Sequence, residues 1–239
     1  MLSRDFLETA LHDSLPLLGA REYEKLAVFS SMVLEENKKF NLTSITGETE
    51  FAYKHLLDSL MFVVLNNDMS SLTIADSGTG AGFPGIPLAI ACPEGSFTLI
   101  ESNTKKCVFL SAVKETLSLK NVQVINSRAE ILSRDKKHRE KYDHVLCRAL
   151  SSFSVSAEIN GALVKQNGSF CFYSGRSQLK DILAKGNTAA AKLGLKIDSS
   201  FDYSLPESMG DHSIVIVKKL WKTEAAYPRE YQKIKKKPL

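Results

Sequence analysis

The sequence contains few cysteines, and none of them are closely paired. Four cysteines are spread over 239 residues, with no C-x-x-C spacing. They are Cys92, Cys107, Cys147 and Cys171. This pattern argues against a zinc site or a disulfide framework and favours reduced thiols in a cytoplasmic compartment. We therefore expect no bound metal.

No segment has the composition of a signal peptide or a membrane span. Met1–Ala20 lacks a basic stretch followed by a long apolar one. The most apolar later segment, Leu56–Leu65, contains Asp58 and is shorter than the roughly 20 residues that a bilayer requires. Apolar residues make up 44% of the chain and charged residues 24%, which is ordinary for a globular protein. The sequence predicts a cytoplasmic protein without a membrane partner.

The motifs of metal-assisted, nucleophilic and paired acid–base catalysis are also missing. No serine lies in a G-x-S-x-G turn, no two carboxylates stand out as a pair, and the five histidines lack H-x-x-x-H spacing. A reaction at an intrinsically nucleophilic atom needs none of these groups. We therefore assign no catalytic side chain from the sequence.

Positive charge is concentrated in two short segments. The net charge is only +4, but residues 218–239 contain eight Lys/Arg and two Asp/Glu. A second basic segment, Arg134–Lys141, reads R-D-K-K-H-R-E-K. Clustered cations beside a nearly neutral body suggest a polyanionic partner. The alternative is a solvated loop and a frayed tail.

The spacing of apolar residues divides the chain into two parts. Residues 1–66 read as a helical N-terminal extension, because Glu22–Phe40 and Glu48–Leu65 repeat apolar residues every three or four positions. Asn41–Ser44 interrupts this pattern with residues that favour turns and caps. Residues 67–239 alternate between strand-like and helical patterns and end in the basic tail.

This alternation predicts an α/β fold with a Rossmann-like, mostly parallel sheet and an antiparallel terminal strand. The expected strands are Leu72–Ala75, Phe97–Ile100, Val122–Ile125, His144–Cys147, Ser169–Tyr173, Lys196–Tyr203 and Ile214–Val217. The expected helices are Lys105–Leu119, Phe153–Val164 and Ser177–Leu193. With no linker or internal repeat, residues 1–239 are expected to form a single domain.

A glycine-rich segment follows the first expected strand. It reads D-S-G-T-G-A-G-F-P-G over Asp76–Gly85. Three alternating glycines leave bare backbone and tolerate φ values that other residues avoid. Pro84 has the fixed φ suited to the start of a helix. A strand, a glycine loop and a helix in this order are typical of a nucleotide-type cofactor site.

The glycine spacing is compatible with more than one cofactor. Gly80-x-Gly82-x-x-Gly85 satisfies the dinucleotide fingerprint, and Glu101 lies about 20 residues further on, where a ribose-binding acid is expected. The loop also reads Asp76-x-Gly78-x-Gly80, which resembles motif I of the methyltransferases that use S-adenosylmethionine. An NAD(P) enzyme, a methyltransferase and a turn without a ligand therefore all remain open at this point.

Residues at the ends of other strands are candidates for the same site, because open α/β sheets bind ligands at the carboxyl ends of their strands. Glu101 could accept hydrogen bonds from ribose hydroxyls, or be an ordinary acid at a helix start. Ala129 and Glu130 lie where an adenine edge would meet the backbone, although Arg128 and Glu130 could instead be a surface pair. Arg148 could hold a carboxylate or a phosphate oxygen, or form an ordinary ion pair.

With these segments in view, the chain resembles the bacterial small-subunit ribosomal RNA guanine-N7 methyltransferase family, also called glucose-inhibited division protein B. The most specific blocks are G-F-P-G-I-P-L in the glycine loop and the ending Y-P-R with K-x-P-L. The matching segments are 41–45, 55–60, 76–89, 101–110, 128–130, 148–149, 227–229 and 237–239.

The resemblance implies a class I methyltransferase fold with S-adenosyl-L-methionine bound by Gly78, Phe83, Ala129, Glu130 and Arg148. Glu101 as a ribose ligand comes from the general methyltransferase pattern. The chain departs from the family at two places. It has Asn167-Gly168 before the expected fifth strand, where the family tends to have Gly-Gly, and Ser174-Gly175-Arg176 after that strand, where the family tends to have Lys-Gly. These departures leave the role of Arg176 in holding RNA open.

The reaction implied by the resemblance is methylation of guanine N7 in 16S ribosomal RNA of the small ribosomal subunit. N7 has a free lone pair and loses no proton on attack, so alignment matters more than a general base. Asn41 and His55 are candidates for lining the pocket of the target base. An NAD(P)-dependent oxidoreductase and a non-catalytic RNA-binding assembly factor are the alternatives.

Overall fold

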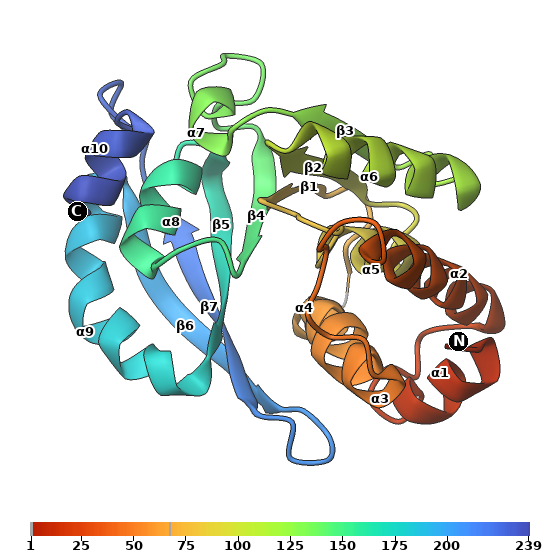
Figure 1. Cartoon of the computed structure of the whole chain (residues 1–239). Coiled ribbons are helices and arrows are strands. Elements are labelled where there is room, and N and C mark those ends of the chain that lie inside the picture. Colours follow the sequence, from red (N-terminus) through yellow and green to blue (C-terminus); the bar gives the residue numbers. More distant parts are fainter. Residues whose placement is uncertain (1, 67) are drawn as a thin grey trace.

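The computed structural model describes residues 2–66 and 68–239, which fold around a seven-stranded sheet with the strand order β3-β2-β1-β4-β5-β7-β6 (Figure 1). The strands are β1 (Thr73–Ser77), β2 (Ser96–Glu101), β3 (Val122–Asn126), β4 (Tyr142–Arg148), β5 (Val164–Gly175), β6 (Leu195–Ser204) and β7 (Asp211–Lys219). The pairs among β1 to β5 are parallel, and β7 is antiparallel to both β5 and β6. The predicted parallel sheet and its antiparallel terminal strand are confirmed.

Helices cover both faces of this sheet. In Figure 1, α8, α9 and α10 lie on one side, and α2, α4, α5 and α6 lie on the other. The helices after β1 are α5 (Gly85–Ala91), α6 (Thr104–Thr116), α7 (Ala129–Leu132), α8 (Phe153–Asn160), α9 (Arg176–Lys192) and α10 (Tyr231–Lys236). The helical segments before it are α1 (Arg4–Leu11), α2 (Ala20–Asn37), α3 (Glu48–Phe51), the π-helical η1 (Ala52–Leu57) and α4 (Asp58–Leu65).

Alternating side chains of the central strands build two separate cores. In β5, Cys171 and Tyr173 join the apolar cluster under the N-terminal helices, whereas Phe170 and Phe172 join the cluster under α8 and α9. In β4, Leu146 likewise joins the first cluster and Val145 the second. Successive residues of a strand point to opposite faces, and both faces are covered here. This double burial explains why these strands read as continuous apolar runs.

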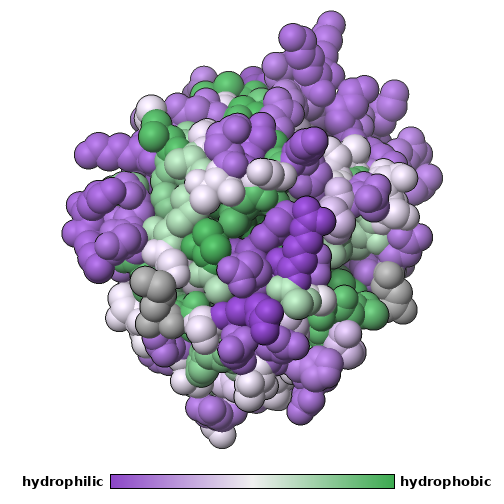
Figure 2. All heavy atoms as spheres, turned by 90° about the vertical axis from the view of Figure 1, so that its right-hand side faces the viewer, coloured by the Kyte–Doolittle hydropathy of each residue, from purple (hydrophilic) through white to green (hydrophobic). Residues whose placement is uncertain are grey.

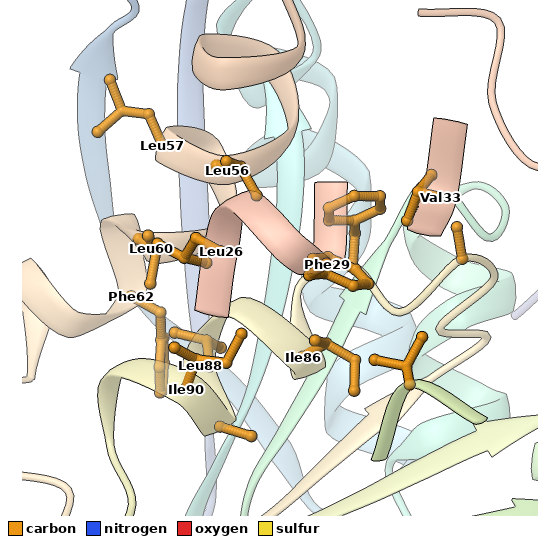
Figure 3. Close-up of a cluster of buried hydrophobic side chains, with 14 of the residues drawn as sticks. Leu26, Phe29, Val33, Leu56, Leu57, Leu60, Phe62, Ile86, Leu88 and Ile90 are labelled. Atoms are coloured by element: carbon orange, nitrogen blue, oxygen red, sulfur yellow. The ribbon is translucent and has the colours of Figure 1, made fainter. Parts of the chain in front are cut away.

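The expected N-terminal extension is packed directly on the first core. α2 and the run from α3 to α4 correspond to the two segments with helical apolar spacing. Figure 3 shows Phe29 of α2 in the same apolar cluster as Ile86 of α5 and Leu56 of η1. The expected boundary between the extension and the sheet falls at residue 67, which lies outside the described residues.

Two expectations about the second half of the chain need correction. The helix expected over Phe153–Val164 ends at Asn160, because Val164 instead begins β5 and pairs with Tyr142 of β4. The basic C-terminal segment contains α10, whose Ile234 is fully buried in the second core. An apolar anchor in the middle of this segment holds it against the fold.

Candidate active site

The glycine loop connects β1 to α5 at the carboxyl edge of the sheet. Gly78, Gly80 and Gly82 have φ values of +71°, +62° and +104°, which disfavour any residue with a Cβ. A Cβ on Gly80 would find its nearest protein atoms 3.9 Å away, so the space above this residue is open. The loop therefore exposes bare backbone to a ligand, as its sequence predicts.

Asp76 closes the base of the loop. Its Oδ2 accepts hydrogen bonds from the Thr79 hydroxyl at 2.5 Å and from the Gly85 N–H at 2.8 Å. Burial raises the pKa of this carboxyl to about 6, although both hydrogen bonds favour its charged form. The helix start can approach this closely because Gly85 has no Cβ, which would lie 2.2 Å from a methyl group of Leu99. Asp76 thus fixes the shape of the loop from beneath.

A cleft of about 390 Å³ opens beside the loop, within the range of small-molecule sites. Four of the six expected ligand-binding residues line it, namely Gly78, Glu101, Ala129 and Glu130. Further lining comes from Gly80, Lys106, Arg128, Ala149, Leu150, Ser151 and Tyr231, among others. The turns after β1, β2, β3 and β4 meet here, as expected for parallel strands that share a carboxyl edge.

Glu101 is held rigidly at the end of β2. One carboxylate oxygen accepts the Gly80 N–H at 3.0 Å, and the other accepts the Asn103 N–H at 2.7 Å. The residue is only 8% exposed, yet it lines the cleft. Since each carboxylate oxygen has a second lone pair, Glu101 can still accept hydrogen bonds from two neighbouring hydroxyls of a ligand. Its contact with Gly80 also fixes it relative to the glycine loop.

The opposite wall of the cleft combines α7 with the C-terminal segment. Arg128 donates from Nε to a Glu130 carboxylate oxygen at 2.5 Å, and its guanidinium lies 4.2 Å from the centre of the Tyr231 ring. The suggested Arg128–Glu130 pair therefore exists, and both residues also line the cleft. Glu130 is 8% exposed.

Phe83 and Arg148 are placed differently from the other expected ligand residues, and their side chains are not part of the cleft lining. The Phe83 ring stacks on His55, with 4.5 Å between ring centres and 12° between planes. The Arg148 guanidinium forms an ion pair with Asp58 at 3.1 Å and donates to the Lys54 carbonyl at 2.8 Å. The three residues that follow Arg148, namely Ala149, Leu150 and Ser151, line the cleft instead.

Arg148 belongs to a buried polar network that joins three parts of the chain. Asp58 of α4 accepts a hydrogen bond from the Tyr203 hydroxyl of β6 at 2.7 Å and lies 2.8 Å from Nδ1 of His212 in β7. Burial by itself raises the pKa of Asp58, but the hydrogen bond from His212 and the charge of Arg148 outweigh burial and lower it. The N-terminal extension thereby clamps the end of β4 to the terminal hairpin.

His55 is a neutral member of this network. Burial, reinforced by the charge of Arg148, lowers the pKa of His55 to about 3. Its Nδ1 lies 3.0 Å from an Arg148 nitrogen that can only donate, so Nδ1 accepts and Nε2 carries the proton. Nε2 then donates to the Thr43 hydroxyl at 2.7 Å. Of the two residues suggested for the target pocket, His55 is thus 8% exposed within the network, whereas Asn41 is exposed.

Two further properties concern the described part of the chain only. Residues 2–66 and 68–239 contain no group of three or more His, Cys, Asp or Glu side chains arranged to hold a metal ion. No helix within the same ranges is long and apolar enough to cross a membrane.

A glycine-loop cleft at the carboxyl edge of a sheet with one antiparallel strand near its end is the architecture of the class I methyltransferases. A solved magnesium protoporphyrin IX methyltransferase from Synechocystis PCC 6803 aligns over 80% of this chain and 99% of its own, with a TM-score of 0.56 and 15% identity. An Agrobacterium tumefaciens protein described as a predicted O-methyltransferase aligns over 71% of this chain and 81% of its own, with a TM-score of 0.52 and 20% identity. At these identities the similarity establishes the fold alone.

The chain belongs to the family described as rRNA small subunit methyltransferase G, whose model matches residues 22–202. A relative of that name from Carboxydothermus hydrogenoformans is 40% identical, covering 91% of this chain and 93% of its own. Another from Leuconostoc citreum is 37% identical and covers 97% of both chains. The resemblance found in the sequence is confirmed, and the oxidoreductase alternative gains no support from these relatives.

Sequence reasoning did not identify several residues of the cleft. Tyr231 lies more than 100 positions from Arg128, its ring partner, and nothing in the local pattern connects them. Leu150 lies over Gly78, where its methyl group would be 2.6 Å from an added Cβ. Lys106 of α6 was part of a segment matched to the family, but no spacing rule singles it out. Only their positions in the fold assign these residues to the cleft.

Proposed function

We propose that this protein transfers a methyl group from S-adenosyl-L-methionine to N7 of a guanosine in 16S ribosomal RNA of the small ribosomal subunit. The main support is the bare backbone of Gly78 and Gly80 beside the carboxylate of Glu101 in one cleft. Family membership and the printed names of the relatives support a ribosomal RNA substrate. We also propose that the protein acts in the cytoplasm, because a ribosomal RNA substrate would be found there.

The residues of the cleft fit this cofactor. Gly80 has open space where a side chain would lie, which leaves room for a flat ligand, and Glu101 offers acceptors for a ribose diol. We propose that Gly78, Glu101, Ala129 and Glu130 contact the cofactor directly. The Arg148 guanidinium is held by Asp58. We therefore propose that Arg148 borders the reactive end of the cofactor only through its backbone, which leads into Ala149 of the cleft lining.

Phe83 would support the same loop from within the core. It stacks on His55 of the N-terminal extension and lies one residue beyond Gly82. We further propose that residues 1–66 and 67–239 act as a single domain, because one apolar cluster joins side chains of both parts.

The mechanism requires positioning more than proton transfer. When bound, S-adenosylmethionine supplies an electrophilic methyl group on a sulfonium. Guanine N7 attacks with a free lone pair and loses no proton, so no side chain has to act as a base. The residues of the chain then need to hold the cofactor and exclude water, and alignment of two reactants can supply about 7–11 kcal/mol. The base must be splayed out of its stack to reach the cleft.

The test is transfer of a labelled methyl group to unmodified 16S ribosomal RNA, followed by nuclease mapping of the product. We expect one N7-methylated guanosine, and we expect Glu101→Gln to lower the rate. Cofactor binding without transfer to RNA, to assembling subunits or to finished subunits would instead support a non-catalytic RNA-binding factor.

A further inference from the structure

The two basic segments of the sequence lie against each other in the fold. Arg139 donates to the carbonyl oxygens of Thr223 at 2.8 Å and Tyr227 at 3.0 Å, and Arg134 donates to that of Pro228 at 2.5 Å. These partners are 84, 88 and 94 positions apart in the sequence. The arginines of the first segment therefore serve to dock the second one, and residues 134–141 and 222–237 form one continuous surface.

The C-terminal part of this surface is rigidly attached. The Arg229 guanidinium binds both carboxylate oxygens of Glu158, at 2.7 and 2.6 Å, and Glu158 of α8 is completely buried. Ile234 of α10 is also fully buried. Because the chain is held just before α10 by Arg229 and within α10 by Ile234, the helix has a defined position on the surface.

Five lysines of the two segments are exposed without acidic partners, whereas Lys233 pairs with Glu230 and Lys219 with Glu140. Lys136 and Lys137 of the loop, and Lys235, Lys236 and Lys237 of the tail, are exposed. Among the residues that the structure describes, none of these five side chains forms an ion pair, whereas Lys38 and Lys39, directly after α2, are paired with glutamates. Residues 134–141 and 218–239 together contain 13 of the 31 Lys/Arg and only four of the 27 Asp/Glu. The rest of the chain is consequently net acidic.

This surface begins at the edge of the cleft. Tyr231 is the first residue of α10 and lines the cleft. Arg128 lies over the Tyr231 ring and comes directly before α7, which leads into the basic loop. Lys235 and Lys236 follow Tyr231 by about one turn of the same helix. A polyanion bound to these lysines would therefore pass beside the mouth of the cleft.

We propose that the lysines of residues 134–141 and 222–237, here called the lysine surface, bind the phosphate backbone of the substrate RNA and hold it next to the cofactor cleft. This proposal rests on the proposed function, because that function supplies an RNA partner. Lysine is suited to such contacts as a mobile point charge, and phosphate contacts position a protein without reading sequence. The arginines of the same segments are occupied with carbonyl groups and Glu158, so they fix the surface.

The test measures binding of unmodified 16S ribosomal RNA to the full chain at several KCl concentrations. The variant Lys235→Gln, Lys236→Gln, Lys237→Gln should bind at least about tenfold more weakly and lower the salt slope by about two units, since each phosphate contact contributes about 0.7–0.9. Lys136→Gln with Lys137→Gln should lower the slope by about two thirds as much. Replacing Lys235, Lys236 and Lys237 with arginine should preserve binding.

The matched control is Lys25→Gln, Lys114→Gln, Lys120→Gln on and next to α2 and α6, which lie on the other side of the molecule (Figure 1). It removes the same charge and should leave the slope unchanged. Equal slopes for the tail variant and this control, with both proteins folded by thermal unfolding, would overturn the proposal. S-adenosylhomocysteine binding, measured by calorimetry, should be the same in all variants. Failure of the wild type to bind it would refute the proposed function while leaving the RNA result valid.

Discussion

Removal of Arg229 should destabilise the protein more than its surface position suggests. Glu158 is fully buried, and its carboxylate accepts three hydrogen bonds from Arg229, one from the backbone and two from the guanidinium. Arg229→Ala leaves the backbone bond but removes the opposite charge. Breaking a buried pair in this way costs about 3–5 kcal/mol, because the remaining charge stays desolvated. For a chain of this size that cost lowers the melting temperature by roughly 10 °C.

Urea unfolding followed by circular dichroism measures this change, and a double variant tests its cause. Arg229→Met combined with Glu158→Leu removes both charges while keeping most of the volume. If the buried carboxylate is the cause, the double variant should recover most of the lost stability, since apolar replacements of buried pairs are often neutral or stabilising. A double variant as unstable as Arg229→Ala would refute the reasoning and leave lost packing of the tail as the explanation.

Three further predictions concern the cleft. Glu101→Gln should weaken S-adenosylhomocysteine binding about tenfold in calorimetry, because hydrogen bonds to charged groups contribute about 1.5–3 kcal/mol; unchanged affinity would remove Glu101 from the site. Tyr231→Ala should weaken the same binding severalfold by opening the wall that Arg128 and Tyr231 form, and an equal loss in Tyr231→Phe would contradict a role for the ring. Burial raises the folded-state pKa of Asp76 to about 6, above its unfolded pKa near 4. The stability that the protonated carboxyl contributes is therefore present below about pH 4 and is lost as the pH rises to about 6. Asp76→Asn should therefore gain stability relative to the wild type between pH 4.5 and 7 in urea unfolding, and a constant difference would contradict this assignment.

An apolar groove lies between α2 and α6. Figure 2 shows apolar side chains in a hollow on this side of the molecule, surrounded by polar ones. Met32 of α2 and Val108 and Phe109 of α6 line a groove here, and Val108 is 66% exposed. Nothing in the structure identifies an occupant, so we assign this groove no role.

Much of the architecture could be predicted because it depends on short-range patterns. The central strands β1, β2, β4 and β5 contain apolar runs buried on both faces, and the helices between them have helical apolar spacing. The glycine loop was identifiable for the same reason, since positive φ values at Gly78, Gly80 and Gly82 demand glycine at fixed intervals. Glu101, Ala129 and Glu130 followed from the rule that parallel strands present their carboxyl ends at one edge.

The remaining features depend on contacts between distant residues, and only the tertiary structure decided them. Arg148 was expected at the cofactor, but its guanidinium lies against Asp58, 90 positions earlier in the chain. The tail could have been a frayed segment, yet Arg229 binds Glu158 across 71 positions and Tyr231 enters the cleft wall. Local periodicity reports only what a residue does within its own helix or strand. Whether a side chain binds a ligand or another side chain depends on which partner the packing of the fold brings within hydrogen-bonding distance.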